Sequence, residues 1–390
     1  MKIINNYQLC SLKLRVSIVA FVVICTSNSA KTQNVSYNLN SIPIGGTLST
    51  GVGHQTLSVN TGAANTAYGY QALHFTTFGA NNTAMGYRAL YSNTTGEWNT
   101  AHGYQALVSN IGGTANTAIG HTALSSNTAG YSNTATGYKA LINNLDGSVN
   151  TATGVIALYA NTTGSYNTAT GDGSLGSNTT GSNNTAVGYN TLSTNLELVN
   201  TTGSNNTAIG FNAGYRTFGS GNVFIGANAG SSEPGSNKFY LCNDSTQTLM
   251  YGSFSTKQIL MGVPYPLGYT FKGNRTLNVV GGILADSVRI APTSAWADYV
   301  FDKNYKLMAV SALAVFIEKN KHLPGIPSSA EVSANGVELT ALNVKLLEKI
   351  EELFLYMIEQ NRKISDQQII LSAQEKQIEK LKMLIVKPGK

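Results

Sequence analysis

One short motif recurs along the chain at a fixed interval. The triplet Asn-Thr-Ala opens each copy, and its asparagines follow one another every 17 residues, at Asn65, Asn82, Asn99, Asn116, Asn133, Asn150, Asn167 and Asn184, before a longer step to Asn206. The glycine that follows the triplet extends the series to eleven copies, from Gly53 to Gly226. A period this short and strict is typical of a one-dimensional stack in which each unit buries its apolar part against its neighbours.

The residues of the unit favour β-structure. Gly, Asn and Thr are poor helix formers, whereas Thr-Ala-x-Gly-Tyr fits a short strand, Ala-Leu an apolar corner and Asn-Thr-Thr-Gly a polar turn. We therefore predict a mostly β protein in which residues 51–232 form a parallel β-roll, or solenoid, of eleven 17-residue rungs. In such a stack Gly permits close backbone approach or a positive φ, Ala and Leu fill a narrow interior, and Asn side chains bond to one another or to their own turns.

Charge is scarce in the repeats. Charged residues are 11% of the chain, against roughly 25% in an average globular protein. Between Gly53 and Gly230 three basic residues stand against four acidic ones, namely Arg88, Lys139 and Arg216 against Glu97, Asp146, Asp172 and Glu197. The formal net charge of +6 is therefore carried outside the repeats. Because no basic patch interleaved with aromatic residues accompanies it, we expect no nucleic-acid partner.

Residues 1–30 have the pattern of a secretory signal peptide. Lys2, Lys13 and Arg15 precede the apolar run from Val16 to Cys25, and small residues follow it, with cleavage after Ser29 or Ala30. The apolar run is too short to cross a bilayer, which takes about 20 residues, so we expect a secreted or cell-surface protein without a transmembrane segment in the mature chain. Lipidation at Cys25 is the weaker alternative. Residues 31–50 are interpreted as a linker.

From Leu339 the apolar pattern changes to a helical period. Residues 339–386 keep an alternating three- and four-residue spacing over more than six heptads, which predicts a coiled coil rather than a solvated surface helix. The predicted core of the assembly is Leu346, Ile350, Leu353, Met357, Gln360, Ile364, Gln367, Leu371, Gln374, Ile378 and Leu381. Ile-rich a positions suit several oligomer states, and the three Gln layers fix register and oligomer number at a cost in stability.

Two segments separate the repeats from this helix. Residues 233–287 contain the runs "NKFYLCN", "TLMYGSF", "QILMGV" and "TLNVVGGILADSVRI", which predict the short strands of a small β neck. Residues 288–338 are interpreted as a C-terminal module with short helices.

Both ends resemble known fibres. The motif NTAxGxxAL is similar to the head repeats of trimeric autotransporter adhesins, which implies a left-handed β-roll shared by three chains. The segments "DYVFDKNYKLM", "NKHLPGIPS" and "KIEEL" resemble the C-terminal module of exported tail-fibre-like proteins of Bacteroidetes-type bacteria, and distantly the endosialidase-type intramolecular chaperones. Such chaperones cleave themselves with a Ser-Lys pair. Because Ser365-Asp366 lies inside the predicted coiled coil, we infer an assembly role without self-cleavage.

Few residues suggest chemistry. The aromatic residues after the motif glycine form the candidate contact ladder, Tyr70, Tyr87, Tyr104, Tyr138, Tyr189 and Phe211. We expect this ladder to pack in the core or between subunits; an exposed ladder would contact sugars. Histidines at 54, 102 and 121 are interpreted as substitutes for aromatic residues. No metal, cofactor or catalytic residue is predicted, because the repeats lack paired carboxylates and a nucleophile with its base.

The sequence thus predicts an exported homotrimeric surface fibre with a structural or adhesive role, and a glycan or a host or matrix surface as its candidate partner. A tailspike-like fibre that binds or cleaves polysaccharide is the first alternative, with acidic residues such as Asp146, Asp172 and Glu197 brought together between chains. The second alternative is an ice-binding solenoid, because every triplet places a Thr in one column from Thr66 to Thr207.

Overall fold

The computed structural model describes residues 35–37, 48–194, 203–244, 247–264, 271, 274–289 and 296–385. They belong to two compact units, one ending at Ile283 and the other beginning at Leu284. The predicted signal peptide, most of the predicted linker and Glu197 lie outside the described residues.

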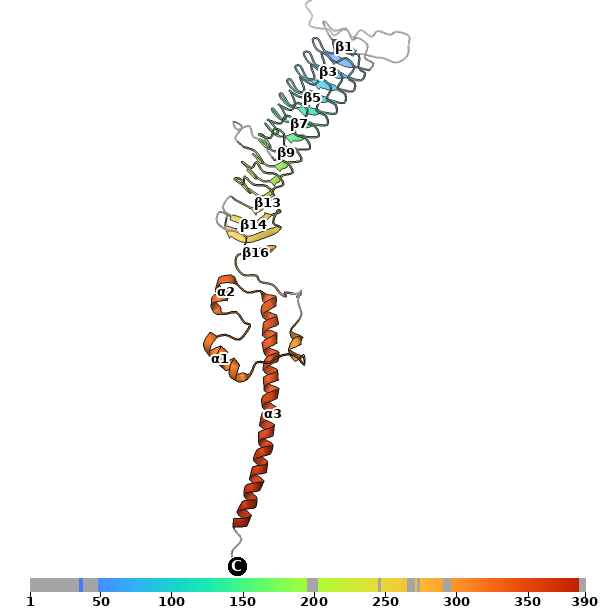
Figure 1. The fold of residues 1–390 in the computed structure, drawn as a ribbon. Helices are drawn as coiled ribbons and strands as arrows, with labels where there is room; N and C mark the ends of the chain where they lie inside the picture. Colours follow the sequence, from blue (N-terminus) through green and yellow to red (C-terminus); the bar gives the residue numbers. More distant parts are fainter. Residues whose placement is uncertain are drawn as a thin grey trace, which may run out of the picture. The chain divides into compact units, whose positions relative to one another are not determined.

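The first unit is a solenoid of three-residue strands (Figure 1). Twelve strands follow one another in parallel through the sheet: β1 (Val35–Tyr37), β2 (Thr50–Val52), β3 (Thr66–Tyr68), β4 (Thr83–Met85), β5 (Thr100–His102), β6 (Thr117–Ile119), β7 (Thr134–Thr136), β8 (Thr151–Thr153), β9 (Thr168–Thr170), β10 (Thr185–Val187), β11 (Thr207–Ile209) and β12 (Val223–Ile225). The predicted parallel solenoid with 17-residue spacing is confirmed. β1 lies within residues 31–50, where a linker was expected, so the described stack has one strand more than the eleven sequence copies.

Equivalent residues stack on one another in register. Thr117, Ala118 and Ile119 pair with Thr134, Ala135 and Thr136 of the next rung. Because side chains alternate along a strand, each triplet buries its central Ala and turns its first and third residues outward. The interior is therefore narrow. It is filled by two Ala columns and one Leu column, represented by Ala118, Ala123 and Leu124, all fully buried.

Asparagine side chains form two ladders inside the stack. In the first, the Oδ1 atom of Asn116 accepts hydrogen bonds from the backbone N and the Nδ2 of Asn133, at 3.0 and 3.1 Å. In the second, Nδ2 of Asn127 donates to Oδ1 of Asn110 at 2.8 Å and to the carbonyl of Gly130 in its own turn at 3.0 Å. Both predicted roles of Asn, along the stack and within turns, are confirmed. Each rung thus repeats the same residues because each one completes the hydrogen bonds of its neighbour.

The motif glycine is required by both conformation and space. Gly120 has a φ of 138°, and a Cβ atom there would lie 2.3 Å from the carbonyl oxygen of Gly137 on the next rung. That distance is far inside van der Waals contact, so no other residue fits while the rungs keep their spacing.

In most rungs three further corners adopt a left-handed conformation without glycine. In one rung these are Gln105, Leu107 and Ala115, with φ between 52° and 56°. Such values are costly for residues with a Cβ atom. The backbone amides of Leu107 and Ala115 are held by carbonyls of adjacent rungs, at 3.0 and 2.9 Å. Stacking therefore compensates for a conformation that an isolated rung would not keep.

A larger side chain closes the interior near the neck. Phe224 takes the Ala position of β12 and is fully buried. Gly214 and Gly230 stand beside it, where a Cβ atom would lie 2.8 Å or less from the Phe224 ring. Glycines in the neighbouring column thus make room for the phenyl ring. On the next strand Tyr240 lies against it, with 5.8 Å between the ring centroids.

The neck extends the sheet with four more strands, β13 (Lys238–Cys242), β14 (Gln247–Ser253), β15 (Gln258–Pro264) and β16 (Leu277–Val279). β13 is parallel to β12, while β14 pairs antiparallel with both β13 and β15. The first three predicted strands are confirmed. The fourth was predicted too long: it ends at Val279, and residues 280–289 form no strand because their side chains, including Ile283 and Leu284, are exposed.

The second unit consists of a 3-10 helix η1 (Ala297–Phe301) and the helices α1 (Val310–Asn320), α2 (Ser329–Asn335) and α3 (Leu339–Ile385). The predicted change to helix at Leu339 is confirmed, and α3 ends within one residue of the predicted boundary. At about 1.5 Å per residue, this helix is on the order of 70 Å long.

Candidate functional surfaces

One side of α3, near its beginning, is covered by its own chain. η1 packs against α3, with Ala297 and Val300 buried. On α3 the buried residues are Glu348 and Glu351. The chain therefore buries carboxylates on this face, and polar partners have to compensate for the lost hydration.

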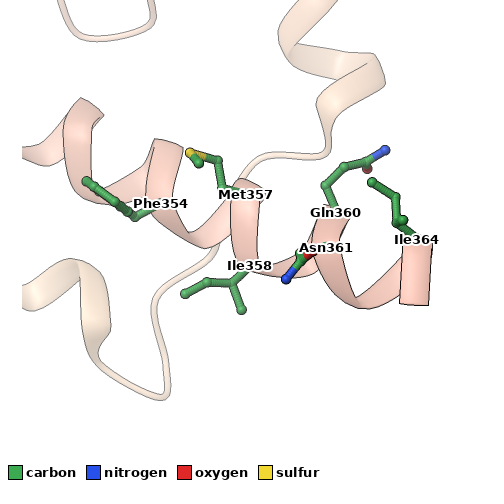
Figure 2. Close-up of a pocket in the computed structure, with 6 residues that line it drawn as sticks. All are labelled: Phe354, Met357, Ile358, Gln360, Asn361 and Ile364. Carbon is green, nitrogen blue, oxygen red and sulfur yellow. The ribbon is translucent and has the colours of Figure 1, made fainter. Parts of the chain in front are cut away.

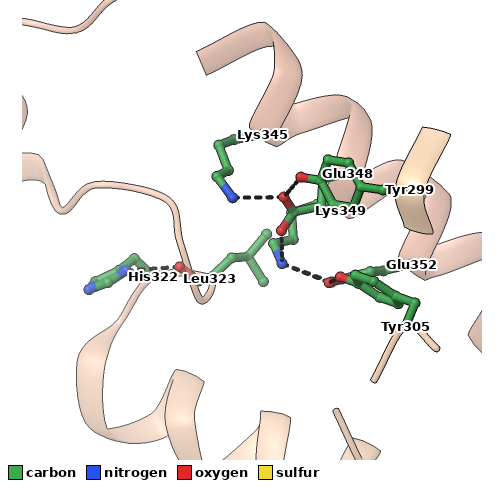
Figure 3. Close-up of polar contacts among 8 residues, drawn as sticks. All are labelled: Tyr299, Tyr305, His322, Leu323, Lys345, Glu348, Lys349 and Glu352. Carbon is green, nitrogen blue, oxygen red and sulfur yellow. Dashed lines mark hydrogen bonds and ion pairs between the residues drawn. The ribbon is translucent and has the colours of Figure 1, made fainter. Parts of the chain in front are cut away.

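Lysines and tyrosines supply partners for Glu348 and its neighbour Glu352 (Figure 3), whereas Oε2 of Glu351 has no hydrogen-bond partner among the described residues. The carboxylate of Glu348 accepts from Nζ of Lys345 at 2.7 Å, forms an ion pair with Lys349 at 3.0 Å, and accepts from the Tyr299 hydroxyl. A second carboxylate, that of Glu352, accepts from Nζ of Lys349 at 2.9 Å and from the Tyr305 hydroxyl. The two tyrosines thereby fix the η1 segment to α3.

The contacts shift the pKa of these groups. Burial alone would raise the pKa of Glu348, but the hydrogen bonds from Lys345, Tyr299 and Lys349 outweigh it and lower the pKa to about 2. The hydrogen bond to Glu348, together with burial, raises the pKa of Tyr299 to about 12. Burial, with the hydrogen bond to Glu352, raises the pKa of Tyr305 as well. These pKa shifts favour the charged form of Glu348 and the neutral forms of Tyr299 and Tyr305.

The predicted core residues of the coiled coil lie on the uncovered side of α3. Residues two positions apart are about 200° apart around a helix, so Leu346 and Ile350 face away from Glu348. The apolar members Leu346, Ile350, Leu353, Met357, Ile364, Leu371, Ile378 and Leu381 expose between 44% and 58% of their surface. The side chains of Gln360, Gln367 and Gln374 are exposed as well. The described part of the single chain thus leaves this apolar seam exposed.

A shallow apolar hollow interrupts the seam. It is lined by Phe354, Met357, Ile358, Gln360, Asn361 and Ile364, all of which come from α3 (Figure 2). Apolar side chains from one helix alone do not enclose a small molecule. The hollow has the character of a gap between the knobs of a helix surface, which a side chain of another helix can enter.

The aromatic rings of the candidate contact ladder stack on one another on the outside of the solenoid. Ring centroids of Tyr70, Tyr87 and Tyr104 are 5.3 and 5.0 Å apart. His54 and His121 extend the stack at 5.4 and 4.9 Å, which confirms their interpretation as aromatic substitutes.

The ladder continues to Tyr138, 5.4 Å from His121, and is then interrupted before the pair Tyr189–Phe211 at 5.5 Å. Val155 and Asp172 take the intervening positions. All six predicted ladder residues expose between 37% and 51% of their surface, so they are not part of the chain's own core. The expectation that the ladder packs in the core of the chain is therefore wrong, because the neighbouring Ala and Leu columns already fill the interior.

The geometry of the ladder limits what it contacts. Adjacent Tyr rings are nearly parallel, with interplanar angles of 6° and 8° between Tyr70, Tyr87 and Tyr104. Their faces therefore lie against one another, and their edges point outward. Stacking of a sugar requires a free ring face, so the ladder is better suited to packing of ring edges and hydroxyl hydrogen bonds than to sugar stacking.

The strand face carries the Thr column. Its members are exposed or half-exposed, as shown by Thr134, Thr151 and Thr168. The third strand position adds a second Thr on three successive rungs, Thr136, Thr153 and Thr170, also exposed or half-exposed. A two-column Thr array therefore exists on β7, β8 and β9, and on the rungs beyond it Ile119 and Val187 take the third position.

The remaining His, Cys, Asp and Glu side chains described in the solenoid and neck do not form a cluster. Among the described residues no group of three His, Cys, Asp or Glu side chains has metal-binding proximity. Asp146 lies in a polar turn and Asp172 in the ladder column, on different columns of the solenoid. Cys242 is buried, and burial raises the pKa of its thiol.

Sequence reasoning missed the η1–α3 network. The sequence pattern did not single out Glu348 or Glu352, and their tyrosine partners are 49 and 47 residues away in sequence. The one available signal was the density of Tyr in "DYVFDKNYKLM", because a Tyr on a buried surface needs a polar partner.

Comparison with known proteins finds no matching family, no matching curated protein and no matching solved structure. Among the described residues no helix is long and apolar enough to cross a membrane.

Proposed function

We propose that this chain is an exported surface fibre, homotrimeric, with a structural or adhesive role. The α3 helices of three copies would form a parallel coiled coil that holds the assembly together, and the solenoid would serve as a stiff, repetitive body. The signal-like leader supports export, and the resemblance of the repeats and the C-terminal module to trimeric fibres supports the number three.

One observation carries this proposal, the exposed seam of α3. Between Leu346 and Leu381 every apolar seam residue is at least 44% exposed, and the chain covers only the opposite face, around Glu348. An apolar stripe of this length is unstable in water without a partner. A period of alternating three and four residues is the spacing that a second and third copy of the same helix would satisfy.

A pair of matched substitutions tests the seam. Ile364 lies on the seam and is 46% exposed, whereas Ile369 is the same residue type, is 69% exposed and lies on the far side of the helix. Ile364→Asp should dissociate the assembly into single chains in sedimentation velocity, and Ile369→Asp should leave its mass unchanged. Equal behaviour of the two variants would remove the basis of the proposal.

The adhesive role is tested on the assembled protein. A glycan and matrix-protein array probed with the trimer should show binding, and Tyr87→Ser combined with Tyr104→Ser should weaken it if the ladder edges make the contact. A trimer that binds nothing on a broad array would leave the structural role alone.

Ice binding is the second candidate, favoured by the two-column Thr array of β7, β8 and β9. Columns of Thr on a flat sheet present hydroxyl and methyl groups at regular intervals of about 4.8 Å along the stack. Thermal hysteresis of a concentrated solution decides the matter, since an ice-binding face must produce it. A freezing point equal to the melting point would end this candidate.

A further inference from the structure

The helix α1 packs against no other helix or strand that the structure describes. It is 11 residues long and contains no buried residue. Its backbone comes within 8 Å of no other helix or strand of the described residues. Isolated helices shorter than about 12–15 residues are marginal in water, so the apolar face of α1 needs a surface to pack on.

The apolar face of α1 is continuous. Val310, Leu313, Ala314 and Ile317 follow the spacing i, i+3, i+4, i+7, which puts them on one stripe of a helix. Val310 is 62% exposed and Ile317 is 38% exposed. The opposite face carries Ala312 and Val315, and Val315 is 65% exposed.

α3 presents a matching surface beside its seam. When Ile350, Met357 and Ile364 take the a positions of the heptad, Phe354 takes position e and Ile358 position b, on the same flank of the helix. They are 55% and 66% exposed, and the hollow in Figure 2 lies between them and the seam. The three seam-forming helices alone would leave this flank partly open.

A hydrogen bond fixes where α1 starts. The Tyr356 hydroxyl donates to the carbonyl of Met308 at 2.6 Å, two residues before α1 begins. Tyr356 takes heptad position g, on the other side of the seam from Phe354. In a parallel bundle the g side of one helix faces the e side of the next. The start of α1 is therefore held next to the position that Phe354 and Ile358 of a neighbouring copy would occupy.

The apolar face of α1 and the exposed surface at Phe354 and Ile358 of α3 agree in length. The chain returns from Met308 to Leu339 at the beginning of α3, so α1 is expected to run antiparallel to α3. From Val310 to Ile317 a helix rises about 10.5 Å. Ile358 and Phe354 are separated by less than this distance along α3. The apolar face of α1 is therefore long enough to cover both side chains.

We propose that α1 of each copy packs its apolar face on the Phe354–Ile358 flank of α3 in the next copy, and so clasps the neighbouring subunit. This inference rests on the proposed parallel assembly. It assigns a partner, a second copy of this chain, to a flank that the coiled-coil seam does not use.

Paired cysteines test the clasp in the chain from residue 31 onward. Cys242 is the sole cysteine there, and Cys242→Ala provides the background. Ala314→Cys with Phe354→Cys, treated with a short bifunctional maleimide, should give covalent dimers and trimers on a denaturing gel. The matched control is Ala312→Cys with Phe354→Cys, because Ala312 is also an exposed alanine but lies on the opposite face of α1; it should give at least fivefold less of both products. Each single-cysteine variant reports the background.

The mass of each variant is measured by light scattering before crosslinking. A trimer whose Ala314→Cys pair crosslinks only within one chain, or no better than the Ala312→Cys pair, overturns the clasp and leaves the proposed fibre standing. Single chains in solution overturn both. Interchain products specific to the Ala314→Cys pair support the clasp.

Discussion

At the scale of single residues, the solenoid depends on positions where only one side chain fits. Gly120 is such a position, because of its φ of 138° and the 2.3 Å approach to the Gly137 oxygen. Gly112 is different: an added Cβ would meet only the Thr95 hydroxyl oxygen, at 3.4 Å. The two glycines are eight residues apart, so they form a natural comparison.

Gly120→Ala should therefore destabilise the solenoid by on the order of 3 kcal/mol or more, since a rung has to move and the backbone is strained. Gly112→Ala should change the free energy of unfolding by less than about 1 kcal/mol. Urea unfolding followed by circular dichroism measures both. Similar midpoints for the two variants would show that the inter-rung contact at Gly120 is not limiting.

The Asn ladders are the second residue-scale device. Asn133 donates to Asn116 at 3.1 Å and to the carbonyl of Gly147 at 2.9 Å, and its own Oδ1 accepts from Asn150. Asn133→Ala leaves these buried groups unpaired, which should cost about 1–3 kcal/mol per unsatisfied group. Thr151→Ala, on the exposed strand face, should cost less than about 0.5 kcal/mol. Urea midpoints that do not separate the two variants would contradict the structural role of the ladder.

At the scale of elements, the η1–α3 contact should depend on pH. The pKa of Glu348 is lowered from 4.5 to about 2 in the folded protein. A depressed folded-state pKa stabilises the fold fully above the unfolded value, and this stabilisation is lost as the pH falls from about 4.5 to about 2. Glu348→Gln should weaken the contact at pH 7 by about 1.5–3 kcal/mol and should remove most of this acid sensitivity.

Trp296 is next to η1 and reports on this contact. In a Trp98→Phe background, its fluorescence during urea unfolding gives the local stability at each pH. Parallel pH profiles for the wild-type side chain and Glu348→Gln would show that Glu348 is not the titrating group.

Elements differ in how well the sequence predicts them. The rungs and α3 were predictable because their periods of 17 and of alternating three and four residues report directly on what repeats in space. β1 was missed because Asn38 stands where the motif has its glycine, and that glycine defined the eleven copies. The end of β16 was overestimated because apolar residues such as Ile283 and Leu284 satisfy a strand pattern while remaining exposed.

The candidate surfaces were predictable only in part. The identity of the ladder residues follows from the repeat, but their direction does not, because Tyr suits both a core and a surface. The partners of Glu348 and Glu352 were hidden because they come from a segment almost 50 residues earlier, a distance that local patterns do not cover.

At the scale of the whole molecule, the account requires that several copies share α3. A single chain leaves the seam from Leu346 to Leu381 in water and leaves the apolar face of α1 without a partner, while the solenoid completes its own core. Association should therefore reside in the C-terminal unit, and the solenoid should fold in its absence as a single chain.

The most direct test is the solution mass of residues 31–390 and of residues 31–338, measured by light scattering over a range of concentrations. The account predicts three chains for the first protein and one chain for the second, which lacks α3. A mass of one chain for residues 31–390 would contradict it, and so would a trimer that persists unchanged in residues 31–338.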